Sequence, residues 1–552
     1  MKIKSIYEKI RKYYPLKYKD NELPHFLKEY FKILNHKIPN SLSPRIGGKF
    51  GKDYYNNLIN KYSTIPKKPS DPLKSSSKIV SDLFQGILRW RSPLLQYNVG
   101  SAVNTPSSAI YSLALDENIY SIDEGLAGNA LVAEKAITRI LSKLADLKKP
   151  GSGLFVFGGT ATNLYATKVG LKKNCPGADK KGVPKNVRIF VTEDSHFTHS
   201  LSADWLGIGT AKIIKIIANK DRTSNIDDFS IKLEKELKKG NIVTSILLNG
   251  GTTYDHTVDE IKKFIEIRDK LVKKYSLKYT PHIHVDSVIG WGWLFFKEYD
   301  FKKNNLNLSK NCLEKIKKQY LKISQLKYAD SWGVDFHKGI GGCPVNSSII
   351  MFNKTSDLAY LSKTNNPELE MHQLAREINY ISPADYTLET SRNAGAALAA
   401  LASLNFLGIE GYQRNLSNLV ENTQLIRELL NNRKDISIIN IFSNGFATMV
   451  RLFPPEISKT TNEDLPKKDI PVISKYIKEF YLWDYKTRIL KNNNSPNYSF
   501  SSSYINYKGN KISAIKIYPV SPHYNKKFAK ETIKILINQK KVFDKEIWQN
   551  KK

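Results

Sequence analysis

The chain has 552 residues, of which 41% are hydrophobic, so it contains enough apolar material for a large core in two or three lobes. No apolar run is long enough to cross a membrane, and the first residues lead into no apolar signal core. The formal charge of +34 is spread over the chain as scattered lysine pairs with acids between them. Because no long basic run with interleaved aromatic residues appears, nucleic-acid binding is not expected as the main function. Three cysteines in so long a chain argue against a disulfide framework and favour a cytoplasmic protein.

The N-terminal part carries no motif with recognisable chemistry. Residues 1–80 are rich in Lys, Tyr, Asn, Pro and Ser, and the Ser-Asp-Pro start of residues 70–77 predicts a loop or linker. Apolar side chains at helical spacing predict one amphipathic helix over residues 127–147, ended by the Pro-Gly pair that follows.

A glycine pair follows the next apolar run. Residues 154–157 predict a strand, and Gly158, Gly159 and Thr160 lead into a helix-compatible segment that ends near Lys173. Glycines at the start of a helix allow backbone N–H groups to approach an anion, and the helix dipole and a hydroxyl add to its binding. The pattern predicts a phosphate site, and an ordinary loop is the alternative.

Two more apolar runs end in polar residues. Residues 187–192 precede His196, which could lie flat on an aromatic cofactor ring or simply bond the backbone of its loop. Residues 242–248 precede an Asn-Gly-Gly-Thr-Thr turn. This strand–turn–helix rhythm predicts a mainly parallel sheet with helices on its faces, whose ligands collect at the C-terminal ends of the strands.

A histidine-rich strand comes next. Residues 281–286 predict a buried strand that presents Asp286 at its C-terminal end. His282, His284 and Asp286 share one face of this strand, so a metal site is an alternative, although no further ligand lies nearby in the sequence.

The stretch Asp335-Phe336-His337-Lys338-Gly339 predicts a tight loop around a lysine, because a further glycine pair follows it. We expect Lys338 to be a Schiff-base lysine with a partly neutral amine; the alternative is a lysine with no special role. Pyridoxal phosphate needs such a lysine, an anion site, and a carboxylate for its ring nitrogen, which Asp286 could supply.

The remaining chain predicts a loop and a smaller domain. Residues 355–387 form a polar segment with a turn signal, typical of a mobile loop that closes over a substrate. Residues 394–407 predict a buried helix closed by Gly408. Strands are expected within 436–453 and over 512–518, with polar loops at 492–495 and 501–503.

In this order the motifs resemble the pyridoxal-phosphate-dependent group II amino-acid decarboxylases, the family of glutamate and aromatic amino-acid decarboxylases. The resemblance covers about residues 80–415, and its His-Val-Asp and Asp-x-His-Lys pieces are the specific ones. The matching pieces are Gly158-Gly159-Thr160, His196, Gly251-Thr252-Thr253, His284-Val285-Asp286, Asp335-Phe336-His337-Lys338 and Ser391-Arg392.

The resemblance implies a role for each site residue. Lys338 would carry the cofactor, Asp286 would bind its pyridine nitrogen, and His196 would stack on the ring. Thr252 would support the cofactor from below, and the phosphate would be held by Gly159, Thr160 and His337. A tyrosine of the mobile loop would donate a proton, and the candidates are Tyr360, Tyr380 and Tyr386.

The resemblance also implies an α/β fold, that of the fold type I pyridoxal-phosphate-dependent transferases. The expected parts are an N-terminal helical arm (1–110), a large cofactor-binding domain with a mainly parallel seven-stranded sheet (111–405) and a small C-terminal α+β domain (406–552). The family forms homodimers with the active site near the interface.

The function implied is decarboxylation of an L-amino acid to the amine and CO₂. The alternatives are a carbon–carbon lyase resembling sphingosine-phosphate lyase, or a non-catalytic protein that has kept the fold. Three departures leave the substrate open: Ser287-Val288 in place of two alanines, a pocket wall altered by residues 290–293, and an inserted surface helix within 302–327.

Overall fold

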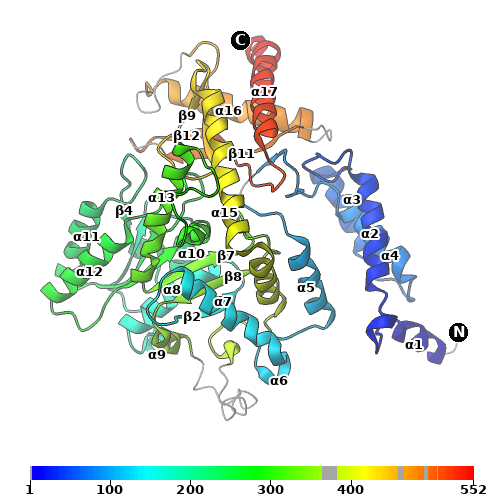
Figure 1. Cartoon of the computed structure of the whole chain (residues 1–552), viewed down its shortest axis with the longest axis horizontal. Coiled ribbons are helices and arrows are strands. Elements are labelled where there is room, and N and C mark those ends of the chain that lie inside the picture. Colours follow the sequence, from blue (N-terminus) through cyan, green and yellow to red (C-terminus); the bar gives the residue numbers. More distant parts are fainter. Residues whose placement is uncertain are drawn as a thin grey trace.

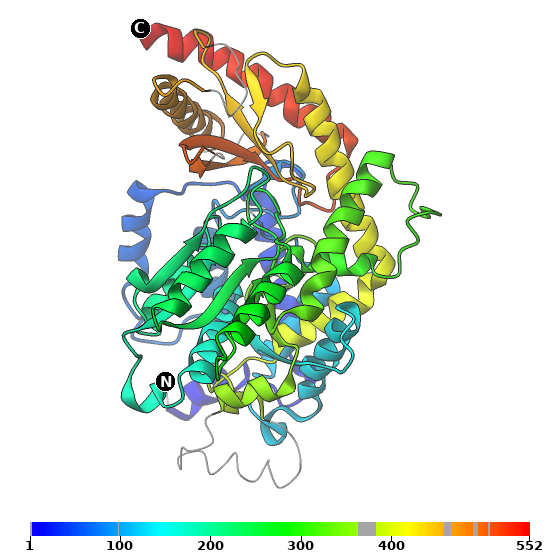
Figure 2. The same cartoon turned by 90° about the vertical axis from the view of Figure 1, so that its left-hand side faces the viewer.

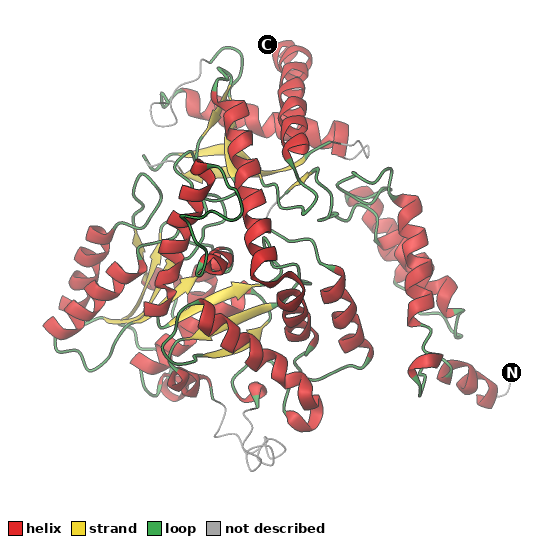
Figure 3. Cartoon of the chain, in the orientation of Figure 1, coloured by secondary structure: helices red, strands yellow, loops and turns green. Residues whose placement is uncertain are grey.

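Two β-sheets, helices around them and an N-terminal arm make up the structure, a computed structural model (Figures 1 and 3). It describes residues 3–97, 99–362, 382–457, 465–489, 495–505 and 508–551. No helix in these ranges combines the length and the apolar composition that crossing a membrane requires.

The larger sheet has seven strands in the order β2-β8-β7-β6-β5-β3-β4. Strand β8 runs antiparallel to both neighbours and all other neighbours are parallel, so the predicted mainly parallel sheet is confirmed. The strands are β2 (Ser152–Val156), β3 (Val187–Thr192), β4 (Ile213–Ile216), β5 (Ile242–Asn249), β6 (His282–Asp286), β7 (Ser331–Asp335) and β8 (Ser348–Phe352).

Helices cover both faces of this sheet, which explains why its central strands are buried apolar runs rather than alternating ones. In β5, Ile246 and Leu248 pack in the main core with α7 (Leu131–Leu144), α11 (Ile226–Lys238), α12 (Ile261–Lys274) and α13 (Lys310–Ile323). Leu247 points to the other face, where α8 (Gly159–Asn174) and α10 (Thr198–Trp205) pack.

The second sheet has five strands in the order β1-β11-β12-β10-β9 and its own hydrophobic core (Figure 2). Its edge strand β1 (Leu95–Gln96) comes from the N-terminal part of the chain and pairs in parallel with β11. The other members of this unit are β9 (Ile436–Ile438), β10 (Thr448–Leu452), β11 (Asn497–Ile505), β12 (Lys511–Ile517), α16 (Asp469–Asp484) and α17 (Lys526–Phe543).

One sequence prediction holds and one fails in this half of the chain. The helix predicted to close at Gly408 does end there, because Gly408 has φ +57°, which glycine adopts with little strain and which breaks the helical backbone. A second helix follows at once, and the two together form the kinked α15 (Gly395–Asn431). The predicted polar loop at 501–503 lies inside β11, where two of the three serines face solvent and a bulge interrupts the pairing with β12.

The N-terminal helices lie to one side of both sheets (Figure 1). They are α1 (Ile3–Arg11), α2 (Leu23–Lys37), α3 (Lys52–Tyr62) and α4 (Pro72–Leu83), followed nearer the body by α5 (Thr105–Asp116) and the short α6 (Glu124–Ala127). The prediction of a loop at 70–77 is wrong, because most of these residues belong to α4. Asp71 accepts a hydrogen bond from Lys74 N (2.7 Å) and caps this helix, and Pro72 lies in its first turn.

The helix predicted from residue 127 begins at Leu131, after a 3₁₀ turn. The surface helix predicted within 302–327 is α13, which exposes one face and buries the other, including Cys312 and Ile316, in the main core. The tryptophans at 291 and 293 also lie in this core rather than in a pocket wall.

Arg392, part of the Ser-Arg motif, is a buried structural residue. Its guanidinium pairs with the Glu134 carboxylate (3.0 Å) and donates to Phe155 O (2.8 Å) and Ser121 O (3.1 Å). The pair therefore links α7, β2 and the segment before α15.

We expect Arg392→Met to lower the free energy of unfolding by about 3 kcal/mol, because it leaves the buried Glu134 carboxylate without a counterion. Chemical denaturation followed by tryptophan fluorescence measures the loss. The control is Arg414→Met, which breaks an exposed pair with Glu410 and should cost well under ~1 kcal/mol. Adding Glu134→Gln should recover part of the loss, and equal stability of Arg392→Met and wild type would contradict the assignment.

Candidate active site

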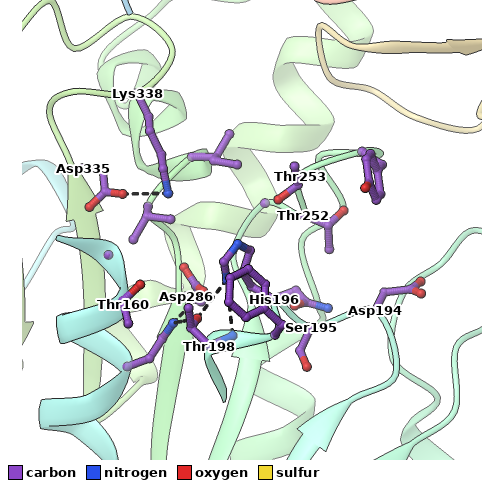
Figure 4. Close-up of a pocket in the computed structure, with 18 of the residues that line it drawn as sticks. Thr160, Asp194, Ser195, His196, Thr198, Thr252, Thr253, Asp286, Asp335 and Lys338 are labelled. Atoms are coloured by element: carbon purple, nitrogen blue, oxygen red, sulfur yellow. Dashed lines mark hydrogen bonds and ion pairs between the residues drawn. The ribbon is translucent and has the colours of Figure 1, made fainter. Parts of the chain in front are cut away.

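The C-terminal ends of the central parallel strands open into one cavity of about 610 Å³ (Figure 4). Parallel strands bring their C-terminal ends to the same edge of a sheet, so residues distant in sequence meet there. All seven residues predicted for the site line this cavity: Gly159, Thr160, His196, Thr252, Asp286, His337 and Lys338.

Asp286, the last residue of β6, is a buried carboxylate with one oxygen held and one free. Its Oδ2 accepts from Asn163 Nδ2 (3.0 Å) and lies 3.3 Å from His199 Nε2. Within the described chain its Oδ1 is buried and bonds no protein group. Burial raises the pKa of Asp286, but His199, Lys338 and Asn163 outweigh burial and hold it well below its usual range. A charged acceptor atom is therefore available to a donor in the cavity.

Lys338 pairs with a carboxylate that the sequence had not assigned. Its Nζ lies 2.8 Å from Asp335 Oδ2, at the end of β7. Burial lowers the pKa of Lys338, but the charges of Asp335 and Asp286 outweigh burial and raise it above the ordinary value. The prediction of a partly neutral amine is therefore wrong for the chain by itself, because Asp335 stabilises the ammonium form.

The predicted anion site is the start of α8. Gly158 precedes this helix with φ +140° and makes no side-chain cap. The Ala161 N–H already donates to Gly158 O (2.9 Å), so the N–H groups of Gly159 and Thr160 are the ones left for an anion. Gly159 also allows a close approach, since a Cβ there would lie 2.7 Å from Asp335 Oδ2. His337 is the third predicted phosphate ligand. Its Nε2 lies 3.7 Å from Asp335 Oδ2, and burial lowers the pKa of the His337 imidazole.

His196 and Thr252 face the same cavity as Asp286 (Figure 4). His196 Nδ1 lies 2.9 Å from Thr198 Oγ1, which fixes the ring. Burial lowers the pKa of His196, so the imidazole is neutral at pH 7. Thr252 Oγ1 accepts from Thr257 N (3.1 Å) within the same loop.

Sequence reasoning missed several residues of the site. Asn163 lies one turn into α8, in the segment predicted to be helix-compatible, and His199 lies one turn after His196 in α10, where no helix was predicted. Asp335 stood inside the quoted motif. Residues 503–505 of β11 also line the cavity, and no local pattern indicates this because they come from the other sheet.

The metal alternative does not include Asp286. His282 Nε2 and His284 Nδ1 both bond Ser331 Oγ, at 2.7 and 2.8 Å. Contrary to the expectation from sequence, two carboxylates do lie near His282, Asp330 and Asp357. Each is already paired with a cation, Asp330 with Arg268 (2.6 Å) and Asp357 with Lys173 (3.2 Å). A divalent ion would add charge to a buried cluster that is already compensated.

Of the three predicted loop tyrosines, the two that the structure describes do not line the cavity. Tyr360 and Tyr386 pack against the cluster around Leu154 and Leu358, and Tyr380 lies outside the described residues. The tyrosines among the described residues that line the cavity are Tyr254 and Tyr504.

The residues present fit pyridoxal phosphate. The free Asp286 Oδ1 suits a pyridinium N–H, the start of α8 suits a phosphate, and Lys338 lies in the same cavity. Fold and site together define a fold type I pyridoxal-phosphate protein.

The chain belongs to the pyridoxal-dependent decarboxylase family, whose conserved domain matches residues 64–450. The predicted family, enzyme class and cofactor are thereby confirmed at the level of the family.

Sequence relatives include L-2,4-diaminobutyrate decarboxylase of Rhizobium meliloti, 24% identical over 56% of this chain. The match spans 55% of that relative's length, about half. A probable L-tyrosine/L-aspartate decarboxylase of Methanosphaera stadtmanae is 25% identical over 60% of this chain and 71% of its own.

Solved structures share the fold. Mouse CSAD has a TM-score of 0.74 at 13% identity and covers 94% of this chain and 98% of its own. Oryza sativa TDC, solved with PLP and tryptamine, has a TM-score of 0.77 at 12% identity. The alignment covers 96% of this chain and 99% of that structure's chain.

We expect Asp335→Asn to lower the pKa of Lys338, because the variant loses the opposite charge that stabilises the ammonium. The amine is then neutral at lower pH, so the pH midpoint of its reaction moves down. The measurement is the rate at which an aldehyde followed by borohydride labels Lys338 in cofactor-free protein, quantified by peptide mass spectrometry. As the control, Ser348→Ala removes a hydrogen bond to Asp335 but keeps its charge, so it should shift the midpoint less. An unchanged midpoint in Asp335→Asn would refute the pairing.

Proposed function

We propose that this protein is a pyridoxal-phosphate-dependent carboxy-lyase that converts an L-amino acid into the corresponding amine and CO₂. The observation that carries the proposal is the buried, ionised Asp286 with a free Oδ1 in the same cavity as Lys338. Membership of the decarboxylase family supports the reaction class.

Each residue contributes a separate function. Pyridoxal phosphate, when bound, accepts the electron pair left by the departing carboxylate. Asp286 keeps the ring nitrogen protonated, and Lys338 attaches the cofactor through its amine. His196 would stack on the cofactor ring and Thr252 would support the cofactor from below. The phosphate is held by the start of α8 with Gly159, Thr160 and His337.

Four further parts of the proposal concern context. The substrate is an L-amino acid. The active form is a homodimer with the site near the interface, which the N-terminal arm supports, since α2 and α3 bury no residue completely within one chain. The domains are residues 1–110, 111–405 and 406–552. The proposed location is the cytoplasm, which is consistent with three buried cysteines that form no disulfide.

Purified protein loaded with pyridoxal phosphate should absorb in the visible, and borohydride should attach the cofactor to Lys338. A screen of amino acids should give equal amounts of CO₂ and amine from at least one. Lys338→Ala should lose both the adduct and the activity, because no other amine is placed to carry the cofactor, whereas the exposed Lys185→Ala should keep both. A carbon–carbon lyase would release no CO₂, and a non-catalytic protein would bind cofactor without turnover; either result contradicts the proposal.

We predict that Asp286→Asn lowers turnover at least ~100-fold, because it removes the charge that keeps the ring nitrogen protonated. Cofactor binding measured by absorbance should survive, since size and some hydrogen bonding are retained. Asp204→Asn, an exposed change on nearby α10, is the matched control. Turnover near that of wild type in Asp286→Asn would remove this carboxylate from the mechanism.

A further inference from the structure

The loop between β5 and α12, residues 250–260, is held by side chains from outside the seven-stranded sheet. It carries Thr252 and four more cavity-lining residues. Four successive carbonyl oxygens, those of residues 253–256, each accept a hydrogen bond from a distant side chain. The donors are Lys516 Nζ to Thr253 O (2.6 Å), Asn440 Nδ2 to Tyr254 O (3.2 Å), Ser443 Oγ to Asp255 O (2.6 Å) and Gln319 Nε2 to His256 O (2.8 Å).

Three of these donors belong to the five-stranded sheet or the loop between β9 and β10. A fifth bond runs from Tyr504 of β11 to Asp255 Oδ1 (3.0 Å). The Gly445 backbone also packs directly against the His256 side chain, because a Cβ on Gly445 would lie 2.3 Å from His256 Cβ. The loop is therefore the place where the five-stranded sheet contacts the cofactor site.

His256 anchors the loop in this second unit. It has φ +53°, is 1% exposed, and its ring lies 4.2 Å from the Phe446 ring and 5.7 Å from the Tyr518 ring. The imidazole thus packs against two aromatic rings that also contact each other (5.4 Å between centroids), and the hydrogen bonds around it fix the backbone on both sides.

Lys516 is the unusual member of the donor set. It lies in β12, is 1% exposed, and its Nζ is 4.4 Å from the Tyr518 ring centroid and 5.8 Å from that of Tyr254. Burying an ammonium is costly unless it is hydrogen-bonded and its charge is compensated. The bond to Thr253 O and the two aromatic faces offset only part of this cost, since burial still lowers the pKa of Lys516 to about 7. The amine can donate the bond to Thr253 O in either protonation state.

We infer that Lys516 is a positioning residue for the cofactor site. Its bond to Thr253 O fixes the neighbouring Thr252 at the cavity wall. The same bond connects the five-stranded sheet to the loop that carries Thr252. The position of that sheet, including residues 503–505 in the cavity wall, therefore affects cofactor binding. The inference rests on the proposed function, because Thr252 is taken to support pyridoxal phosphate.

The test uses two variants and one matched control in the full-length protein. Lys516→Met keeps the length of the side chain and removes the donor, and Ser443→Ala removes one hydroxyl from the same set of contacts. Lys540→Met is the control, since Lys540 is also 1% exposed and lies 5.4 Å from the Tyr476 ring, but it bonds Asp544 of the C-terminal helix instead of the loop.

The readouts are the dissociation constant of pyridoxal phosphate for apo protein, the thermal midpoint without cofactor, and amide hydrogen exchange over residues 252–257. We expect the dissociation constant to rise about tenfold in Lys516→Met and about threefold in Ser443→Ala, with faster exchange in the loop. Lys540→Met should lower the thermal midpoint as much as Lys516→Met, yet bind cofactor within about twofold of wild type.

A general loss of stability would weaken cofactor binding equally in Lys516→Met and Lys540→Met, and that result would overturn the inference. Wild-type affinity in both Lys516→Met and Ser443→Ala would overturn it as well, while the proposed function would stand. If Lys516→Met fails to fold, Ser443→Ala decides alone. A wild-type protein that binds no pyridoxal phosphate refutes the proposed function and this inference together.

Discussion

The site depends on one buried charge, the carboxylate of Asp286. Placing an ionised carboxylate in the interior is unfavourable unless hydrogen bonds and opposite charges compensate it. Asn163 and His199 provide that compensation on one oxygen, from two different helices packed on the same face of the sheet. The other oxygen is left for the ligand. Both helices must therefore pack correctly near the end of β6 for the Asp286 carboxylate to be ionised.

Helix α8 links the separate tasks of the site. Its start, directly after β2, presents N–H groups to an anion, and its first turns carry Asn163 toward Asp286. Gly159 lets Asp335 approach closely enough to hold the Lys338 ammonium. Anion binding, the charge of Asp286 and the position of the lysine are thus set by the packing of one helix against β7 and β6.

The second sheet completes the cavity from outside. Residues 503–505 form part of its wall, and the loop after β5 is bonded to β12 and to the loop between β9 and β10. The two units therefore share a wall of the cavity, and the geometry of that wall depends on how they are docked. The kinked α15, which packs in both cores, fixes this docking from the other side.

The sequence by itself determined the parallel sheet, the residues at its C-terminal edge and the family, because these depend on local patterns: apolar runs, glycine turns and short motifs. Asp286, Lys338 and Gly159 were identified in this way. Tertiary structure decided what no local pattern carries. Arg392 became a structural ion pair, and His282 of the metal alternative lies with Asp330 and Asp357, whose charges Arg268 and Lys173 compensate. It also brought Tyr504 and Lys516 to the cofactor site. The reason is physical: pKa values and hydrogen bonds depend on neighbours in space, and folding chooses those neighbours from segments hundreds of residues apart.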